Sequence, residues 1–197
     1  MTCPRCFLLL LTLPLWAAAC GHSPEPRVYT LVAQPAGPTF ATASLIEVRR
    51  PPMAGYLDRR DIVLAIRAER LEFAADANWA EPLDAMLGRV LAGSLALRLP
   101  RSRVASDLSS LGVMPDFQVD VDLQRFERGP DGQVAMRALT VVRRQGMAAS
   151  LEVVELSRSA GGSDTADTVA TMSALLGDLA DRLARTISAS VASEPNR

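Results

Sequence analysis

Residues 117–123 alternate strictly between apolar and polar side chains. A period of two places successive side chains on opposite faces of a β-strand, so this segment is expected to bury one face and expose the other. Two turn sequences and two further strand-like stretches follow it, in the order 129–132, 134–142, 143–146 and 148–156. Three strands joined by two short turns predict an antiparallel meander.

A first long helix is expected directly before this meander. Asn78 and Glu81 have the spacing of a capping box, Pro82 fits the first turn, and Pro100 marks the end. Apolar or small residues recur at helical spacing between them: Leu83, Met86, Leu87, Val90, Leu91, Ser94 and Leu95. Such a stripe predicts one helix face buried in the core.

A second long helix is expected after the meander, with Ser163 or Asp164 as its N-cap. Its apolar residues again step by three or four: Val169, Met172, Leu176, Leu179, Leu183 and Ile187. The opposite side carries acidic residues and arginines. This amphipathic pattern predicts a helix that packs lengthwise on the sheet.

Shorter strands are expected in the first half of the chain, with a Pro- and Gly-containing loop at 34–38. They cover residues 27–32, 44–48, 61–66 and 70–73. Together these elements predict the α/β class: a single domain over 27–192, with a mixed β-sheet that includes the antiparallel meander and packs against two main helices. Residues 193–197 are expected to form a disordered tail.

The first nineteen residues have the order of a secretory signal peptide. Arg5 precedes a Leu-rich stretch, which ends in three alanines before Cys20. The apolar stretch is shorter than the roughly 18 residues of a spanning helix, so a transmembrane anchor is the weaker interpretation. A Cys after small residues resembles the bacterial lipobox, although Ala17 stands where Leu is usual. The alternative is an ordinary signal peptide that is cut near Ala19 and leaves a free thiol.

Lipidation of Cys20 would anchor the protein by acyl chains. Two chains on one residue are enough for stable membrane attachment. Residues 20–26 then form a short polar tether, and residues 1–19 leave with the signal peptide. Gly21 follows the lipidated position, which by analogy with the known sorting rule favours the outer membrane, with the protein facing the periplasm.

The composition and the motif search do not favour an enzyme. The chain of 197 residues has a net charge of −1, one His and three Cys, so it lacks the basic excess of a nucleic-acid binder and the residues of a His-based triad or metal site. Nucleophile-elbow, P-loop and dinucleotide motifs are absent from the sequence. Asp120 and Asp122 are interpreted as a solvated strand face. We therefore expect no enzyme activity, no cofactor and no metal.

Several short segments in a fixed order resemble the ABC-type transport auxiliary lipoprotein family, whose members are subunits of transporters associated with membrane integrity. The most specific part is the succession YLDR, IV and WAEPL over about thirty residues. The segments that carry the resemblance are YTL at 29–31, GYLDR at 55–59, DIV at 61–63, WAEPL at 79–83, RVL at 89–91 and LP at 99–100.

This resemblance implies a role in an MCE-type system that transports lipids or hydrophobic solutes. The protein would be an accessory subunit that docks the trans-envelope complex at the outer membrane, with an MCE-domain protein and the ABC transporter and permease components as partners. The family also implies self-association. Two other hypotheses stay open: a lipid-binding or chaperone module with its own apolar pocket between sheet and helix, and an enzyme of unknown type.

Candidate partner-contact residues lie in the first part of the family pattern. They are Tyr56, Leu57, Asp58, Arg59 and Arg60. Tyr and Arg are enriched at protein interfaces, which favours a contact surface. The structural interpretation is equally open: Tyr56 and Leu57 as a loop anchor on the core, and Asp58 with Arg59 as a local ion pair.

Overall fold

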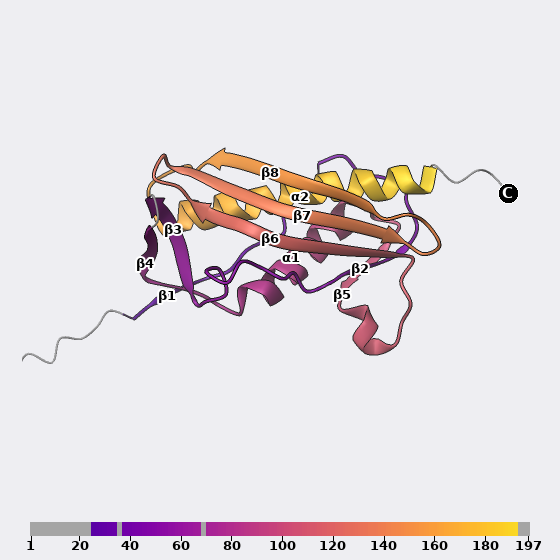
Figure 1. The fold of residues 1–197 in the computed structure, drawn as a ribbon, viewed down its shortest axis with the longest axis horizontal. Coiled ribbons are helices and arrows are strands. Elements are labelled where there is room, and N and C mark those ends of the chain that lie inside the picture. Colours follow the sequence, from indigo (N-terminus) through magenta and orange to yellow (C-terminus); the bar gives the residue numbers. More distant parts are fainter. Residues whose placement is uncertain (1–24, 35–36, 68–69, 193–197) are drawn as a thin grey trace, which may run out of the picture.

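The computed structural model describes residues 25–34, 37–67 and 70–192 as two β-sheets and two long helices (Figure 1). The expected signal peptide, Cys20 and the expected tail at 193–197 lie outside the described residues. Of the tether, Glu25 and Pro26 are described, and both are exposed. The α/β class, with a mixed sheet on two helices, is confirmed.

The larger sheet has five strands in the order β5-β2-β6-β7-β8. Strand β2 lies parallel to β5 and β6, whereas β6, β7 and β8 form the predicted antiparallel meander. Gly132 and Gly146 have positive φ angles in the two turns, where glycine avoids the strain of a Cβ atom. The strands are β2 (Leu45–Val48), β5 (Arg103–Ser106), β6 (Phe117–Arg128), β7 (Gln133–Arg144) and β8 (Ser150–Ser159).

The smaller sheet consists of β1 (Arg27–Tyr29), β4 (Arg70–Trp79) and β3 (Asp61–Arg67), in that order. Strand β4 extends to Trp79, beyond the expected end at residue 73, so the first helix starts later than expected. Asn78 is not a helix cap, because its backbone pairs with Asp61 in β3.

Helix α1 (Leu83–Arg98) begins at Leu83, with Pro82 as N-cap and without a side-chain cap. The expected capping box is therefore wrong. Its predicted apolar stripe is buried, and Leu99 follows the last helical residue just before Pro100, as expected. Strand β5 and a short 3-10 turn, η1 (Leu108–Leu111), were not expected from the sequence pattern.

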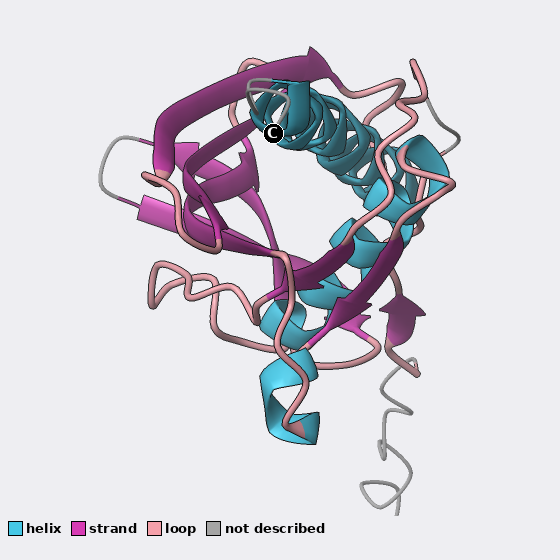
Figure 2. Cartoon of the chain, turned by 90° about the vertical axis from the view of Figure 1, so that its right-hand side faces the viewer, coloured by secondary structure: helices cyan, strands magenta, loops and turns pink. Residues whose placement is uncertain are grey.

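Helix α2 (Thr165–Ala192) lies along one face of β6, β7 and β8 (Figure 1), and the end view shows the sheet curving around it (Figure 2). All six predicted apolar positions of α2 are buried. Asp164 is the cap, because its Oδ1 accepts the backbone N–H of Asp167 at 2.7 Å. Helix α1 packs against α2 and completes the core.

Arg98 joins the two helices from inside the core. Its side chain is 2% exposed, pairs with Asp181 of α2, and donates to the carbonyl of Ser94 at 2.9 Å. Gly177 lies beside it and packs against Gln34, whose Cβ would be 3.0 Å from a Cβ added at position 177. Because a buried charge is costly unless it is paired, these contacts fix the position of α1 on α2.

Candidate functional site

The β3–β4 hairpin brings the two most specific parts of the family pattern together. Residues 55–60 lead into β3, and residues 79–83 leave β4. The backbone N–H of Trp79 donates to the carbonyl of Arg60 at 2.8 Å, so the two segments lie side by side. Segments about twenty positions apart in sequence thereby form one surface site.

A surface pocket of about 240 Å³ lies between these segments. Trp79 is nearly buried and connects the pocket to the core. The next residue, Ala80, donates its N–H to the carbonyl of Tyr29 at 2.8 Å, which ties the pocket to β1. The residues that line the pocket include Asp58, Arg59, Arg60, Trp79, Glu81 and Leu83.

Tyr56 and Leu57 hold the loop on the fold. Leu57 is 2% exposed and belongs to the core. The Tyr56 hydroxyl donates to Glu127 Oε2 at 2.6 Å. Burial, and then the hydrogen bond to this carboxylate, raise the pKa of Tyr56, so the hydroxyl keeps its proton. Both side chains serve the structural role that the sequence left open.

Glu127 is the residue that the sequence pattern missed. Its side chain has no exposed surface, yet it lies on a strand with a polar face. Besides Tyr56 it accepts the backbone N–H of Phe126 at 3.0 Å and pairs with Arg125. A register shift between Leu123 and Arg125 interrupts the alternation of β6 just before it. A bulge re-aims side chains, which explains why simple alternation fails here.

Asp58, Arg59 and Arg60 are exposed and form the outer part of the site. Arg59 pairs with Asp61 at 3.1 Å and lies over the ring of Phe73, with its guanidinium carbon 4.1 Å from the ring centre. The ion pair is therefore not the Asp58–Arg59 pair of the alternative interpretation. Among the described residues, Arg60 has no ion-pair partner, so its charge faces solvent.

A second charged pair borders the site. Arg50 donates to both carboxylate oxygens of Asp84 in the first turn of α1, with Nη2 at 2.9 Å from Oδ1. This hydrogen bond lowers the pKa of Asp84. The surface around the pocket thus carries both signs of charge at fixed positions.

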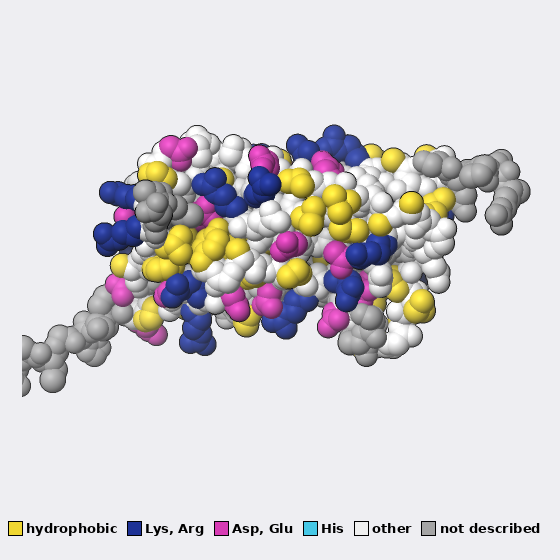
Figure 3. Space-filling model, viewed as in Figure 1, with side chains coloured by type: hydrophobic (Ala, Val, Ile, Leu, Met, Phe, Trp, Pro, Cys, Tyr) yellow, Lys and Arg dark blue, Asp and Glu magenta, His cyan; other side chains and the backbone are white. Residues whose placement is uncertain are grey.

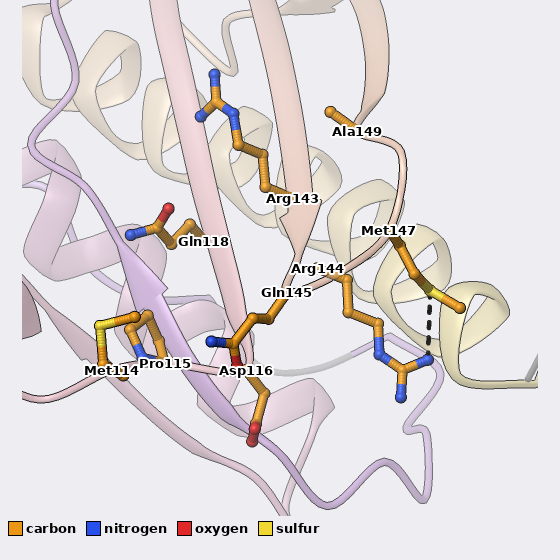
Figure 4. Close-up of a pocket in the computed structure, with 9 residues that line it drawn as sticks. All are labelled: Met114, Pro115, Asp116, Gln118, Arg143, Arg144, Gln145, Met147 and Ala149. Atoms are coloured by element: carbon orange, nitrogen blue, oxygen red, sulfur yellow. Dashed lines mark hydrogen bonds between the residues drawn. The ribbon is translucent and has the colours of Figure 1, made fainter.

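Another pocket, of about 250 Å³, lies at the far ends of β6 and β7 (Figure 4). Met114 and Met147 are exposed at its rim. Its polar groups are used within the chain: Asp116 Oδ2 accepts the N–H of Leu45 at 2.7 Å, and Arg144 donates to the carbonyl of Ser190 at 3.0 Å. Asp116 and Arg144 are thus held by contacts within the chain.

The described part of the chain contains no cluster of three His, Cys, Asp or Glu that could hold a metal, and none of its helices is long and apolar enough to cross a membrane. Asp120, one of the predicted strand-face acids, pairs with Arg143 and Arg49. Core side chains such as Met136 and Leu179 are at most 1% exposed and fill the space between the large sheet and α2. This packing weighs against an acyl-chain pocket there.

A family model described as ABC-type transport auxiliary lipoprotein component matches residues 29–184. No curated protein matches the chain. A crystal structure titled only as an uncharacterized protein is 21% identical, with a TM-score of 0.70, over 83% of this chain and 99% of that chain.

Protein XCC0632 from Xanthomonas campestris is 16% identical, with a TM-score of 0.69, over 85% of this chain and 99% of its own. These two structures share the fold. The PelC dodecamer from Paraburkholderia phytofirmans is 11% identical, with a TM-score of 0.42, over 75% of this chain and 92% of that chain. The match over residues 29–184 shows that the chain belongs to the family of ABC-type transport auxiliary lipoprotein components.

Proposed function

We propose that this protein is a lipid-anchored accessory subunit that docks an MCE-type transport complex at the outer membrane, on its periplasmic side. The observation that carries the proposal is the assembly of the family's two specific segments into one exposed, rigidly supported site. In this site Asp58, Arg59 and Arg60 are exposed, whereas the adjoining Leu57 and Trp79 are buried in the core. Such an arrangement suits recognition of a protein surface, because charge complementarity fixes partner and register.

The proposed anchor lies close to this site in the chain. Strand β1 begins at Arg27, and six residues after Cys20 span at most about 20 Å. Tyr29 of β1 contacts the pocket segment through Ala80. With Cys20 lipidated, the small sheet and its pocket would stand near the bilayer.

The proposed partners are an MCE-domain protein and, through it, the ABC transporter and permease. Self-association of the subunit is part of the same proposal. Neither requires a cofactor or a catalytic group on this chain.

Pull-down from cells tests the docking role. The wild-type lipoprotein is expected to recover an MCE-domain protein. Arg60→Glu should reduce the recovery at least tenfold, because it reverses an exposed charge in the pocket. Arg101→Glu, at an exposed arginine after α1, is the matched control and should recover wild-type amounts. If Arg60→Glu recovers as much MCE-domain protein as the wild type, the assigned contact site is wrong. If the wild type recovers no MCE-domain protein, the proposed docking function is wrong.

A further inference from the structure

The segment that follows the expected tether lies across both long helices. It comprises residues 27–34, which are β1 and the residues directly after it, and we call it the strap. The backbone N–H of Leu31 donates to Met86 Sδ of α1 at 3.1 Å. The N–H of Val32 donates to Ser173 Oγ of α2 at 3.2 Å. The strap is therefore held by α1, by α2 and, through the pairing of β1, by β4.

One side chain supplies most of the apolar contact of the strap. Leu31 is 1% exposed and belongs to the core, whereas Val28 and Val32 are 65% and 57% exposed. Strand β1 has three residues, and β4 is its only strand partner among the described residues. The thioether sulfur that accepts the Leu31 N–H is a weak acceptor. Segments with few buried apolar contacts open before the rest of a fold, so we expect the strap to detach while the helices and the larger sheet stay folded.

The strap also supports the pocket between residues 55–60 and 79–83. Ala80 lines this pocket and donates its N–H to the carbonyl of Tyr29 in the strap at 2.8 Å. The preceding N–H, that of Trp79, donates instead to the carbonyl of Arg60 at 2.8 Å. Two adjacent amides thus report on two different supports of the pocket, and only one of these supports belongs to the strap.

A pull from a lipid anchor would reach the strap before the rest of the fold, because β1 is the first strand after Cys20. Surface charge of one sign could attach the body of the protein directly to anionic lipid. Figure 3 shows basic and acidic side chains interspersed at the end of the molecule where β1 lies, rather than gathered into a basic patch. The strap is therefore the connection through which the anchor would act on the pocket.

We propose that residues 27–34 form a detachable strap that couples the membrane anchor to the docking pocket. When the tether is pulled, the strap leaves α1, α2 and β4, and the pocket loses the support of Ala80 and its affinity for the partner. The next backbone contact along the chain is the N–H of Phe40, which donates to the carbonyl of Arg98 at 2.8 Å. Detachment would therefore lengthen the reach of the chain after Cys20 from about 20 Å to about 65 Å. The coupling rests on the proposed anchor and docking function, whereas the detachment does not.

Residue-resolved amide hydrogen exchange of the full-length lipoprotein in detergent tests the detachment. We expect the Leu31 and Ala80 amides to share one opening equilibrium and to exchange at least tenfold faster than the Trp79 amide, after correction for intrinsic rates. Leu31→Ala should speed the exchange of Ala80 at least tenfold, because it removes the buried side chain. Val32→Ala, at a mostly exposed side chain, should stay within twofold of wild type. Equal protection of Ala80 and Trp79, or equal effects of the two substitutions, would overturn the detachable strap.

A reversible lock tests the coupling to docking. A Cβ added at Gly93 of α1 would lie 3.5 Å from the Cβ of Ala33, within the range of a disulfide. In pull-down, Leu31→Ala should recover at least tenfold less MCE-domain protein than wild type. With Ala33→Cys and Gly93→Cys added, the oxidised protein should recover at least threefold more than the same protein after reduction.

Leu31→Ala with Gly93→Cys alone is the matched control, because it lacks the second thiol of the lock and should respond to neither oxidation nor reduction. Equal recovery by the oxidised and reduced forms of the locked protein would overturn the coupling. Failure of the wild type to recover any MCE-domain protein would overturn the docking function and the coupling together. The exchange of Ala80 against Trp79 would still decide whether the strap detaches.

Discussion

Tyr56 and Glu127 lie 71 positions apart and meet under the loop that carries the exposed site residues. The carboxylate has no exposed surface, so it depends on the donors that surround it. Tyr56 supplies one of these donors, and the Arg125 guanidinium and the backbone N–H of Phe126 supply the others. Tyr56 thus fastens the loop of residues 55–60 to β6.

Replacing Tyr56 by Phe removes this donor while keeping the ring. We expect Tyr56→Phe to lower the free energy of unfolding by about 1–3 kcal/mol, the usual cost of leaving a buried polar group short of a partner. Urea denaturation measures the change. Tyr29→Phe is the control, because the Tyr29 hydroxyl has no hydrogen bond among the described residues, and its effect should be small. Equal effects of the two substitutions would show that Glu127 does not need Tyr56.

Asp84 gives a pH-dependent prediction. Its pKa is lowered in the folded protein, chiefly by the hydrogen bond from Arg50. A group with a depressed folded pKa stabilises the fold above its unfolded pKa, near 3.9, and loses that contribution as pH falls through the folded value. Arg50→Gln should therefore be less stable than wild type at pH 7, with a difference that shrinks as pH falls below about 4. Urea denaturation across pH checks it, and a difference that is constant with pH would contradict it.

Helix α2 is the longest element, and its start is fixed by one side chain. Asp164 accepts the N–H of Asp167 and also carries negative charge at the positive end of the helix dipole. Ser163, the other residue that the sequence offered as a cap, has no hydrogen bond among the described residues. The two neighbours therefore make a natural pair for comparison.

Asp164→Ala should cost about 1 kcal/mol of stability, the typical value for loss of an N-cap side chain. Ser163→Ala should leave the unfolding free energy nearly unchanged. Thermal or urea unfolding distinguishes the two. A larger loss in Ser163→Ala than in Asp164→Ala would mean that the cap is assigned to the wrong residue.

The contact between α1 and α2 depends on Arg98. Arg98→Met keeps the aliphatic length but leaves the Asp181 carboxylate without its guanidinium partner, so we expect a loss of about 1–3 kcal/mol. Arg185→Met on the exposed side of α2 is the control and should change little, since among the described residues Arg185 bonds only to a backbone carbonyl of its own helix. Urea denaturation checks the pair, and equal effects would contradict a specific role of Arg98.

At the scale of the whole molecule, the proposed anchor and the elongated fold together define an orientation. Strand β1 enters at one end of the elongated fold, whereas the start of β8 lies toward the other end (Figure 1). Ten residues of strand span roughly 30 Å. A protein anchored ahead of β1 would therefore hold the β3–β4 end of the fold nearer the bilayer and the start of β8 farther from it (Figure 1).

Lipid attachment can be tested directly at Cys20. Mass spectrometry of the amino-terminal peptide of native protein should show a thioether-linked lipid, which Cys20→Ala abolishes and Cys6→Ala preserves, because Cys6 leaves with the expected signal peptide. Membrane association should also resist high salt, since residues 20–197 hold 20 basic and 22 acidic residues and supply no net positive charge. An unmodified thiol at residue 20 would overturn the anchor.

Local pattern was sufficient for the meander and the buried stripes of both helices, and it limited the cap of α2 to Ser163 or Asp164, of which the structure selects Asp164. Alternation and helical spacing depend on residues a few positions apart, and the structure confirms them in β6 and α2. The same local logic failed at Asn78. Asn and Glu at capping-box spacing favour a helix start, but pairing with Asp61 in β3 keeps Asn78 in a strand. A non-local partner decided between two locally acceptable structures.

The sequence by itself determined the class of fold, the order of its main elements and, through the short motifs, the family. Only the tertiary structure decided that β2 lies parallel to both β5 and β6, that Glu127 is buried beneath Tyr56, and that β8 is left as an open edge. The physical reason is that a side-chain pattern records which face of an element is buried. Which element covers that face, and which backbone edge stays unpaired, depends on contacts between residues distant in the chain.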